Sequence, residues 1–193
     1  LCDCFLNRPN VASHRQLLLQ QVSGRVLEIG FGTGLNLPWY PSQLQQLSVI
    51  EPNTGMHRRA QERIRQAGIK IDVHQTTAAQ LPFEESSYDA VVSTFTLCSI
   101  REVDLALSEV YRVLKPAGRF LFLEHGLSPE VHIQTWQRRL NWLQKSLGDG
   151  CHLDRNIREL VASQPYAALN VETQYLERTP RIFGYLYRGI ATK

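Results

Sequence analysis

The sequence predicts an α/β fold, with helices on both faces of an open and mostly parallel β-sheet. Short stretches rich in β-branched and aliphatic residues recur along the chain, as expected for buried strands. Stretches with helical spacing of apolar residues separate them, and this alternation is typical of parallel sheets. A glycine-rich turn follows the first predicted strand, at the place where open α/β sheets bind nucleotide-type ligands.

The composition is that of an ordinary globular chain. Its 193 residues are enough for one α/β domain with a core. Hydrophobic residues make up 43% and charged residues 20%, which argues against disorder. The net charge of +3 is too small to indicate a nucleic-acid partner, and no apolar run is long enough to span a membrane. We therefore expect neither nucleic acid nor a membrane span in this chain.

The cysteines indicate neither zinc nor a disulfide framework. No C-x-x-C pair occurs among Cys2, Cys4, Cys98 and Cys151. This usage is typical of a reducing compartment. We expect a cytoplasmic protein without a metal site.

Residues 1–24 form a leading segment, and residues 25–193 form one domain without repeats or a linker. The apolar residues between Val11 and Gln21 predict a short helix in the leading segment. Two roles remain open for it. It either covers an edge of the sheet or acts as a lid that keeps water from the ligand site.

The first predicted strand, residues 25–29, runs into Gly30, Gly32 and Gly34. Glycines at alternate positions allow positive φ angles and let a ligand approach the backbone closely. The second strand, residues 47–50, ends at Glu51, about 20 residues beyond Gly30, which is the spacing of an acid that holds ribose hydroxyls.

Two prolines limit the segment after the glycines to a short helix. Its Trp39 and Tyr40 belong either to the core or to one wall of a substrate pocket. Asn53 or Thr54 caps the next helix, which ends at Gly68. Strands follow at 69–74 and 88–93, and the loop after the second one is expected to border the reacting group.

A helix over 103–114 leads to a strand over 119–123 that ends in Glu124 and His125. At the carboxyl end of a strand, His125 faces the expected pocket as a general base or a substrate hydrogen-bond partner. A purely structural histidine is the alternative. The last predicted elements are an amphipathic helix through residues 133–147, a short helix over 155–163, and strands over 170–176 and 182–191.

The order of the glycines separates two kinds of ligand. A dinucleotide fingerprint is G-x-G-x-x-G, whereas this chain has G-x-G-x-G preceded by Glu28. The stretch resembles motif I of the class I S-adenosylmethionine-dependent methyltransferases. Residues 77–83 are similar to the D-A-x-x-L-P-F segment of that family, and residues 109–118 to its E-x-x-R-V-L-K-P-G-G signature, with Ala117 in place of the first glycine.

Within the class, the chain is most similar to the methyltransferase-like 7 group of thiol methyltransferases and its bacterial relatives. Four stretches carry this likeness: 97–100, 124–125, 149–151 and 180–185. The resemblance implies a Rossmann-like, seven-stranded and mostly parallel sheet with an antiparallel edge strand. It also implies S-adenosylmethionine as cofactor and methyl transfer to a small-molecule acceptor.

The resemblance further implies which residues hold the cofactor. Glu28 organises its amino end and Glu51 holds its ribose. Thr77 stands where the family has an acid for adenine, so the backbone amides of Ala78 and Ala79 are expected to serve there. The expected cofactor-binding residues are Glu28, Gly30, Phe31, Gly32, Gly34, Asn36, Glu51, Pro52, Thr77, Ala78, Ala79 and Thr94.

Several functions remain open at this point. A thiol acceptor reacts as the thiolate and needs little help from a base, whereas an amine or a hydroxyl needs more, and His125 is then the candidate. Quinone-type and lipid acceptors also fit the expected mouth of Trp39, Tyr40, Phe95 and Leu97. Outside methyl transfer, the alternatives are a nicotinamide-dependent oxidoreductase and a non-catalytic cofactor-binding module.

Overall fold

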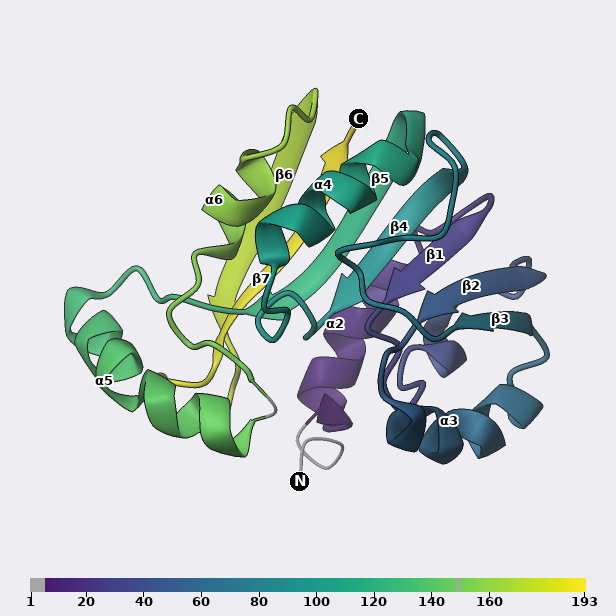
Figure 1. Ribbon diagram of the computed structural model, residues 1–193. Coiled ribbons are helices and arrows are strands. Elements are labelled where there is room, and N and C mark those ends of the chain that lie inside the picture. Colours follow the sequence, from purple (N-terminus) through teal and green to yellow (C-terminus); the bar gives the residue numbers. More distant parts are fainter. Residues whose placement is uncertain (1–5, 149) are drawn as a thin grey trace.

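The computed structural model describes residues 6–148 and 150–193, without the side chains of Met56 and His57. Cys2, Cys4 and Asp149, which entered the sequence analysis, lie outside the described residues. Seven strands form one sheet in the order β3-β2-β1-β4-β5-β7-β6 (Figure 1). The strands are β1 (Val26–Ile29), β2 (Gln46–Ile50), β3 (Lys70–His74), β4 (Tyr88–Thr94), β5 (Leu114–His125), β6 (Ala168–Tyr175) and β7 (Tyr185–Thr192).

The first five strands of the sheet run parallel, and the register brings their ends together. Ile29 of β1 pairs with Ile50 of β2 on one side and Ser93 of β4 on the other. The glycine turn, Glu51 and Thr94 therefore begin at the same level of the sheet. β7 is antiparallel to β5 and lies between β5 and β6, so the antiparallel pairing is confined to one side of the sheet. The predicted fold is confirmed.

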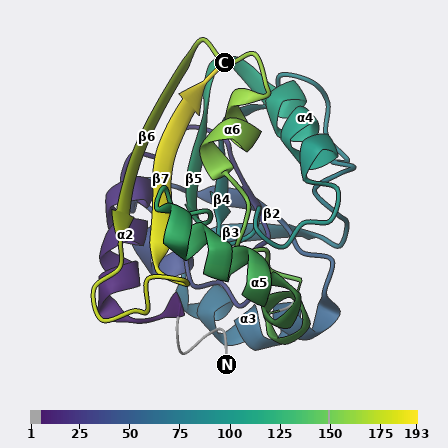
Figure 2. The ribbon, with the colours of Figure 1, turned by 90° about the vertical axis from the view of Figure 1, so that its left-hand side faces the viewer.

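Helices cover both faces of the sheet. Figure 2 shows α2 on one side, with α4 and α6 on the other. Leu18 of α2 and Ala60 of α3 pack with Val49 in one core, whereas Leu107 of α4 and Ile157 of α6 pack in the other. The helices are α2 (Pro9–Leu19), the 3-10 helix η1 (Leu37–Trp39), α3 (Thr54–Gln66), α4 (Val103–Val113), α5 (Val131–Leu147) and α6 (Ile157–Ala162).

Helix α2 combines features of both roles that were open for the leading segment. Its Val11, Leu18 and Leu19 are fully buried against the sheet, which is the packing of a covering helix. Leu6 and Arg8 just before it line the ligand cavity described below. The segment therefore packs on the sheet through α2 and lines the cavity through the residues before α2.

Helix α5 forms where it was predicted, but its apolar side chains are only partly buried. Ile133 and Gln137 are buried, whereas Trp136 is 50% and Leu147 75% exposed. The reason is its position, since α5 extends beyond the sheet near the lower ends of β6 and β7 (Figure 1). Among the described residues, no helix has the length and apolar character to cross a bilayer.

Candidate active site

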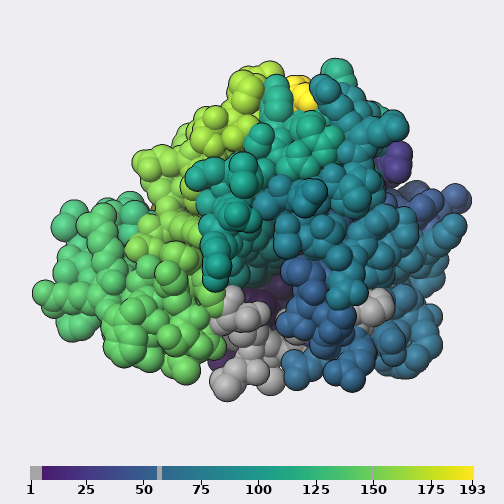
Figure 3. Space-filling model, viewed as in Figure 1, coloured from purple at the N-terminus to yellow at the C-terminus, as the bar shows by residue number. Residues whose placement is uncertain are grey.

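A cavity of about 870 Å³ lies at the carboxyl ends of the parallel strands. Gly30 follows β1, Glu51 follows β2, Phe95 follows β4 and His125 ends β5, and all four line it. Figure 3 shows a recess in this face between the green atoms of the α5 region and the blue atoms of the α3 region. The volume is within the range of sites for small molecules and cofactors.

The glycine turn has the backbone that the sequence analysis expected. Gly30, Gly32 and Gly34 all have positive φ angles, of 69°, 56° and 77°. The amide groups of Gly30 and Phe31 both donate to the Ile50 carbonyl, at 2.9 and 3.2 Å, which ties the turn to β2. A Cβ atom at Gly30 would lie 2.2 Å from the Thr96 side chain. A side chain at this position is therefore excluded on two grounds.

Glu51 is held against the same turn. Its Oε2 accepts a hydrogen bond from the Gly32 amide at 2.7 Å, and its Oε1 accepts one from the Asn53 amide at 2.9 Å. Each carboxylate oxygen keeps a second acceptor position. The carboxylate is therefore fixed on the cavity wall and still able to accept from a pair of hydroxyl groups.

Glu28 lies at the bottom of the cavity and is 1% exposed. Its Oε1 accepts from Asn36 Nδ2 at 3.0 Å, and its Oε2 accepts from Tyr40 Oη at 2.7 Å. Burial raises the pKa of Glu28 to about 7, and the hydrogen bonds from Tyr40 and Asn36 oppose that rise. Tyr40 is therefore a buried partner of Glu28 and does not line the cavity.

Arg15 of α2 joins this network, and the sequence analysis did not identify it. It is 3% exposed, its Nη1 donates to Asn36 Oδ1 and to Thr94 Oγ1, the latter at 2.9 Å, and its guanidinium lies 5.3 Å from the Phe95 ring. The available signal was its position between Val11 and Leu18, on the face of α2 that packs inward. An arginine on such a face requires polar partners inside the protein.

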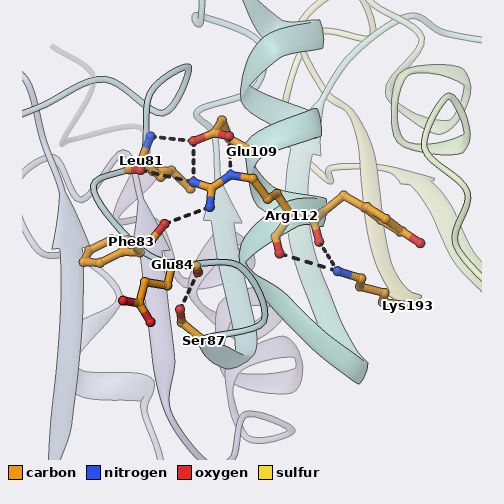
Figure 4. Close-up of polar contacts among 8 residues, drawn as sticks. Leu81, Phe83, Glu84, Ser87, Glu109, Arg112 and Lys193 are labelled. Carbon is orange, nitrogen blue, oxygen red and sulfur yellow. Dashed lines mark hydrogen bonds and ion pairs between the residues drawn. The ribbon is translucent and has the colours of Figure 1, made fainter.

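The loop after β3 closes another side of the cavity, with Thr77, Ala78 and Ala79 on its wall. Two residues of α4 hold this loop (Figure 4). Glu109 Oε2 accepts from the Leu81 amide at 2.8 Å, and Arg112 Nη1 donates to the Phe83 carbonyl at 2.8 Å. Arg112 Nε also binds Glu109 Oε1 at 2.6 Å. The signature over residues 109–118 thus positions the loop that was expected to meet adenine.

The far end of the cavity is formed by the loop after β4. Glu124, fully buried, accepts hydrogen bonds from the amides of Thr96 at 3.0 Å and Leu97 at 3.1 Å and from Ser93 Oγ at 2.8 Å. Burial raises the pKa of Glu124, against these hydrogen bonds. The loop is thereby folded so that Phe95 and Cys98 face the cavity.

Three polar side chains meet at this end. His125 Nε2 lies 2.6 Å from Cys151 Sγ, and Cys151 Sγ lies 3.4 Å from Cys98 Sγ. The hydrogen bond with Cys98 holds the pKa of the Cys151 thiol well below its usual range and raises that of Cys98. Burial lowers the pKa of His125, but the hydrogen bond to Cys151 and the negative charges of Cys151 and Glu124 together outweigh it, so the net direction is upward. The cysteine spacing predicted neither zinc nor a disulfide framework, and nothing in the sequence predicted that Cys98 and Cys151 would meet beside His125.

Every expected cofactor residue except Gly34 lines the cavity. Gly34 shapes the turn instead, since its amide donates to the Phe31 carbonyl at 3.0 Å. Of the residues expected at the mouth, Phe95 lines the cavity, whereas Trp39 packs against the core on the α2 face and Leu97 is fully buried in the other core. His125 lines the cavity beside both cysteines.

Comparison with known proteins identifies the kind of site. A methyltransferase domain family matches residues 27–122. Thiol S-methyltransferase TMT1B of Rattus norvegicus is 34% identical over 82% of this chain and 68% of its own length. The ubiquinone/menaquinone biosynthesis C-methyltransferase UbiE of Brucella suis is 34% identical over 79% of this chain and 61% of its own length.

The fold is shared with solved structures at lower identity. Phosphoethanolamine N-methyltransferase 2 of Haemonchus contortus, in complex with S-adenosyl-L-methionine, superposes with a TM-score of 0.72 at 18% identity, over 98% of this chain and 59% of that one. The glycine turn, the fixed Glu51 and the cavity volume all suit this cofactor. The chain belongs to the class I S-adenosylmethionine-dependent methyltransferases.

Proposed function

We propose that this methyltransferase transfers the methyl group to the sulfur atom of a small thiol. The observation that carries the proposal is the chemistry of the far end of the cavity, where Cys98, His125 and Cys151 face the ligand space. Thiol groups and an imidazole are polarisable partners for a sulfur acceptor. The thiol S-methyltransferase among the relatives supports the same acceptor class.

The chemistry asks little of the protein beyond alignment. The cofactor supplies an electrophilic methyl group on a sulfonium centre. A thiol ionises near pH 8.5, so its thiolate forms without a strong base, whereas an alcohol requires one. We propose that the proton of the acceptor thiol passes to solvent water, so that Cys98, His125 and Cys151 need only position its sulfur. The acceptor sulfur then bonds to the methyl carbon as the carbon–sulfonium bond breaks, and that electron pair remains on the cofactor sulfur.

We propose that the chain orients the cofactor with the residues already expected from the sequence. Glu28 and Asn36 face its amino-acid end, Glu51 its ribose, and the segment Thr77–Ala79 its adenine. Their support is geometric, since these groups line one continuous cavity and are fixed by hydrogen bonds or by buried loops. Because the cofactor loses its freedom of motion when it binds, holding it in the reactive orientation lowers the barrier to methyl transfer by several kcal/mol.

A quinone-type acceptor is the second candidate, because the UbiE relative is as identical as the thiol relative over a similar share of this chain. That relative's own length is covered only to 61%. The wall formed by Phe95, Ile100 and Phe183 accommodates a flat ring as well as an alkyl thiol.

The compartment also belongs to this proposal. Cys98 and Cys151 are free thiols although their sulfur atoms are 3.4 Å apart. Thiols this close together stay reduced in a reducing compartment, and we propose that the protein works in the cytoplasm.

The test is a matched panel of acceptors with S-adenosylmethionine, read by mass spectrometry of the methylated product. We expect an alkyl thiol to be methylated at least ~100-fold faster than the alcohol with the same chain, because the alcohol is not ionised at neutral pH. A demethylated quinol and vesicles of phosphatidylethanolamine complete the panel. Turnover of either one, with none of any thiol, would replace the proposal.

A further inference from the structure

Cys98, His125 and Cys151 form the one cluster among the described residues in which at least three potential metal ligands converge. One ligand atom from each lies within 4.8 Å of the other two. Two thiolates and an imidazole are a preferred ligand set for Zn²⁺. The cysteine spacing had indicated no metal, because the three residues come from separate segments of the chain.

The three ligand atoms can hold a tetrahedral ion after shifts of about 1 Å in their separations. With Zn–S of about 2.3 Å and Zn–N of about 2.0–2.1 Å, the two sulfurs stand about 3.8 Å apart and each stands about 3.5 Å from the nitrogen. The observed separations are 3.4 Å between Cys98 and Cys151 and 2.6 Å between Cys151 and His125. Cys98 and His125 lie within 4.8 Å of each other. An ion therefore requires the Cys151–His125 separation to open by about 1 Å and the Cys98–His125 separation to close by up to about 1.3 Å.

The segments that carry the ligands are tied to one another. The His152 amide, next to Cys151, donates to the carbonyl of Cys98 at 2.8 Å. Arg155 donates to the carbonyls of Leu97 and Ile100, the latter at 2.7 Å, on either side of Cys98. Preorganised ligands of this kind reduce the ordering cost of binding a metal.

Charge also favours an ion at this position. Cys98 is 1% and Cys151 6% exposed, and Glu124 lies beside them. Metal binding replaces the thiol proton of Cys98, and a divalent ion with two thiolates adds no net charge at this buried position. The arrangement leaves the fourth tetrahedral position to the cavity, since all three side chains line it.

We infer that Cys98, His125 and Cys151 form a three-ligand Zn²⁺ site whose fourth position receives the acceptor sulfur. The assignment of the fourth ligand rests on the proposed thiol acceptor, whereas the site itself does not. A zinc ion in this position lowers the pKa of a coordinated thiol and holds its sulfur at one place in the cavity. Three protein ligands with one open position are the arrangement of catalytic rather than structural zinc.

The first experiment measures the metal alone. The full chain, with Cys2 and Cys4 replaced by serine and reduced with a phosphine, is loaded with Zn²⁺ or Co²⁺. We expect one equivalent of zinc by mass spectrometry, and with cobalt the thiolate charge-transfer and intense visible bands of a tetrahedral site. Less than ~0.1 equivalent with a featureless cobalt spectrum would overturn the inference.

The variants assign the ligands. Cys98→Ser, Cys151→Ser and His125→Gln are each expected to weaken zinc binding at least ~100-fold in competition with a chromophoric chelator. His152→Gln is the matched control, because this histidine is adjacent to Cys151 but pairs with Asp154 at 3.6 Å. Binding of S-adenosylmethionine verifies that each variant folds. If the Cys98→Ser variant and the Cys151→Ser variant each bind zinc as tightly as the native protein, the assignment is refuted.

The last experiment separates this inference from the proposed function. An alkyl thiol added to the cobalt form is expected to shift its visible bands, and the matched alcohol is expected to leave them unchanged. An unchanged spectrum with the thiol would remove the acceptor from the fourth position. Thiol methylation at the full rate by metal-free protein would do the same and leave the thiol acceptor standing.

Discussion

The end of the cavity formed by β1 and β2 and the end formed by β4 and β5 differ in how their polar groups are held. At the first, or cofactor, end the partners are near in sequence: Asn36 and Tyr40 bind Glu28 from 8 and 12 residues away, and Gly32 binds Glu51 from 19. At the second, or acceptor, end Cys151 meets His125 across 26 residues and Cys98 across 53. The cofactor end is therefore a local structure, and the acceptor end is a product of the tertiary fold.

The comparison is tested most strongly by Gly30→Ala, which should disable the cofactor end. Its Cβ would lie 2.2 Å from the Thr96 side-chain tip, and rotation of Thr96 does not help because its own Cβ is 2.7 Å away. We expect a loss of about 3 kcal/mol in the free energy of unfolding and at least ~100-fold in S-adenosylmethionine affinity. Thermal unfolding and titration calorimetry measure the two effects.

Gly68→Ala is the matched control for this change. Gly68 has nearly the same φ angle, 65°, but a Cβ there would have no atom within 4 Å. Backbone strain alone should cost about 1 kcal/mol and leave cofactor binding intact. Equal effects at both glycines would show that the close approach to Thr96 is unimportant.

Arg155→Ala should disable the acceptor end while sparing the cofactor end. The guanidinium holds the carbonyls of Leu97 and Ile100 around Cys98. A misplacement of about 1 Å can cost about 100-fold in rate, so we expect kcat/KM for a thiol to fall by about 30- to 100-fold. The Kd of S-adenosylmethionine should change less than about threefold, because the hydrogen bonds of Arg155 to Leu97 and Ile100 hold the loop after β4 and not the cofactor end.

Arg158→Ala provides the control, since Arg158 lies three residues further on α6 and is exposed. Arg158→Ala should leave both kcat/KM for a thiol and the Kd of S-adenosylmethionine unchanged. Equal losses of cofactor affinity and thiol turnover in Arg155→Ala would mean that the two ends are not independent.

The same contrast explains what the sequence could predict. Strands 25–29 and 47–50 were placed within one residue of β1 and β2, and Glu28 and Glu51 were assigned from motif spacing. Arg15 was missed because its contact with Thr94 spans 79 residues, even though it belongs to the cofactor end. The meeting of Cys98 with Cys151 was missed for the same reason, since spacing along the chain does not determine which distant segments pack together.

The pH dependence of stability and binding tests the buried acid of the cofactor end. Burial raises the pKa of Glu28 from 4.5 to about 7, while Arg15 lowers it and Glu51 raises it. Between those pH values the unfolded chain ionises this group and the folded chain does not. The free energy of unfolding should therefore fall as pH rises from 4.5 to 7, by on the order of 3 kcal/mol at 1.36 kcal/mol per pKa unit.

Glu28→Gln should remove that decline. The free energy of unfolding of the variant should therefore rise relative to that of the native protein as pH rises from 4.5 to 7. The native protein should also bind S-adenosylmethionine more tightly at pH 7.5 than at pH 6, because an ionised Glu28 attracts the cofactor's ammonium group. The variant should bind it weakly at both. Melting curves and calorimetry across this range decide the matter, and parallel curves for the two proteins would assign the pH dependence to other groups.

Ala117→Gly should have the smallest effect and touch neither end. Ala117 has a φ angle of 63°, where the family signature has glycine, and its amide donates to the Lys193 carbonyl at 3.0 Å. Relief of the left-handed strain gains about 1–2 kcal/mol, and the greater freedom of glycine in the unfolded chain offsets about half of it. We expect a net gain of about 0.5–1 kcal/mol with unchanged cofactor affinity and thiol turnover. A loss of stability would mean that the Ala117 methyl group makes packing contacts worth more than the strain it imposes.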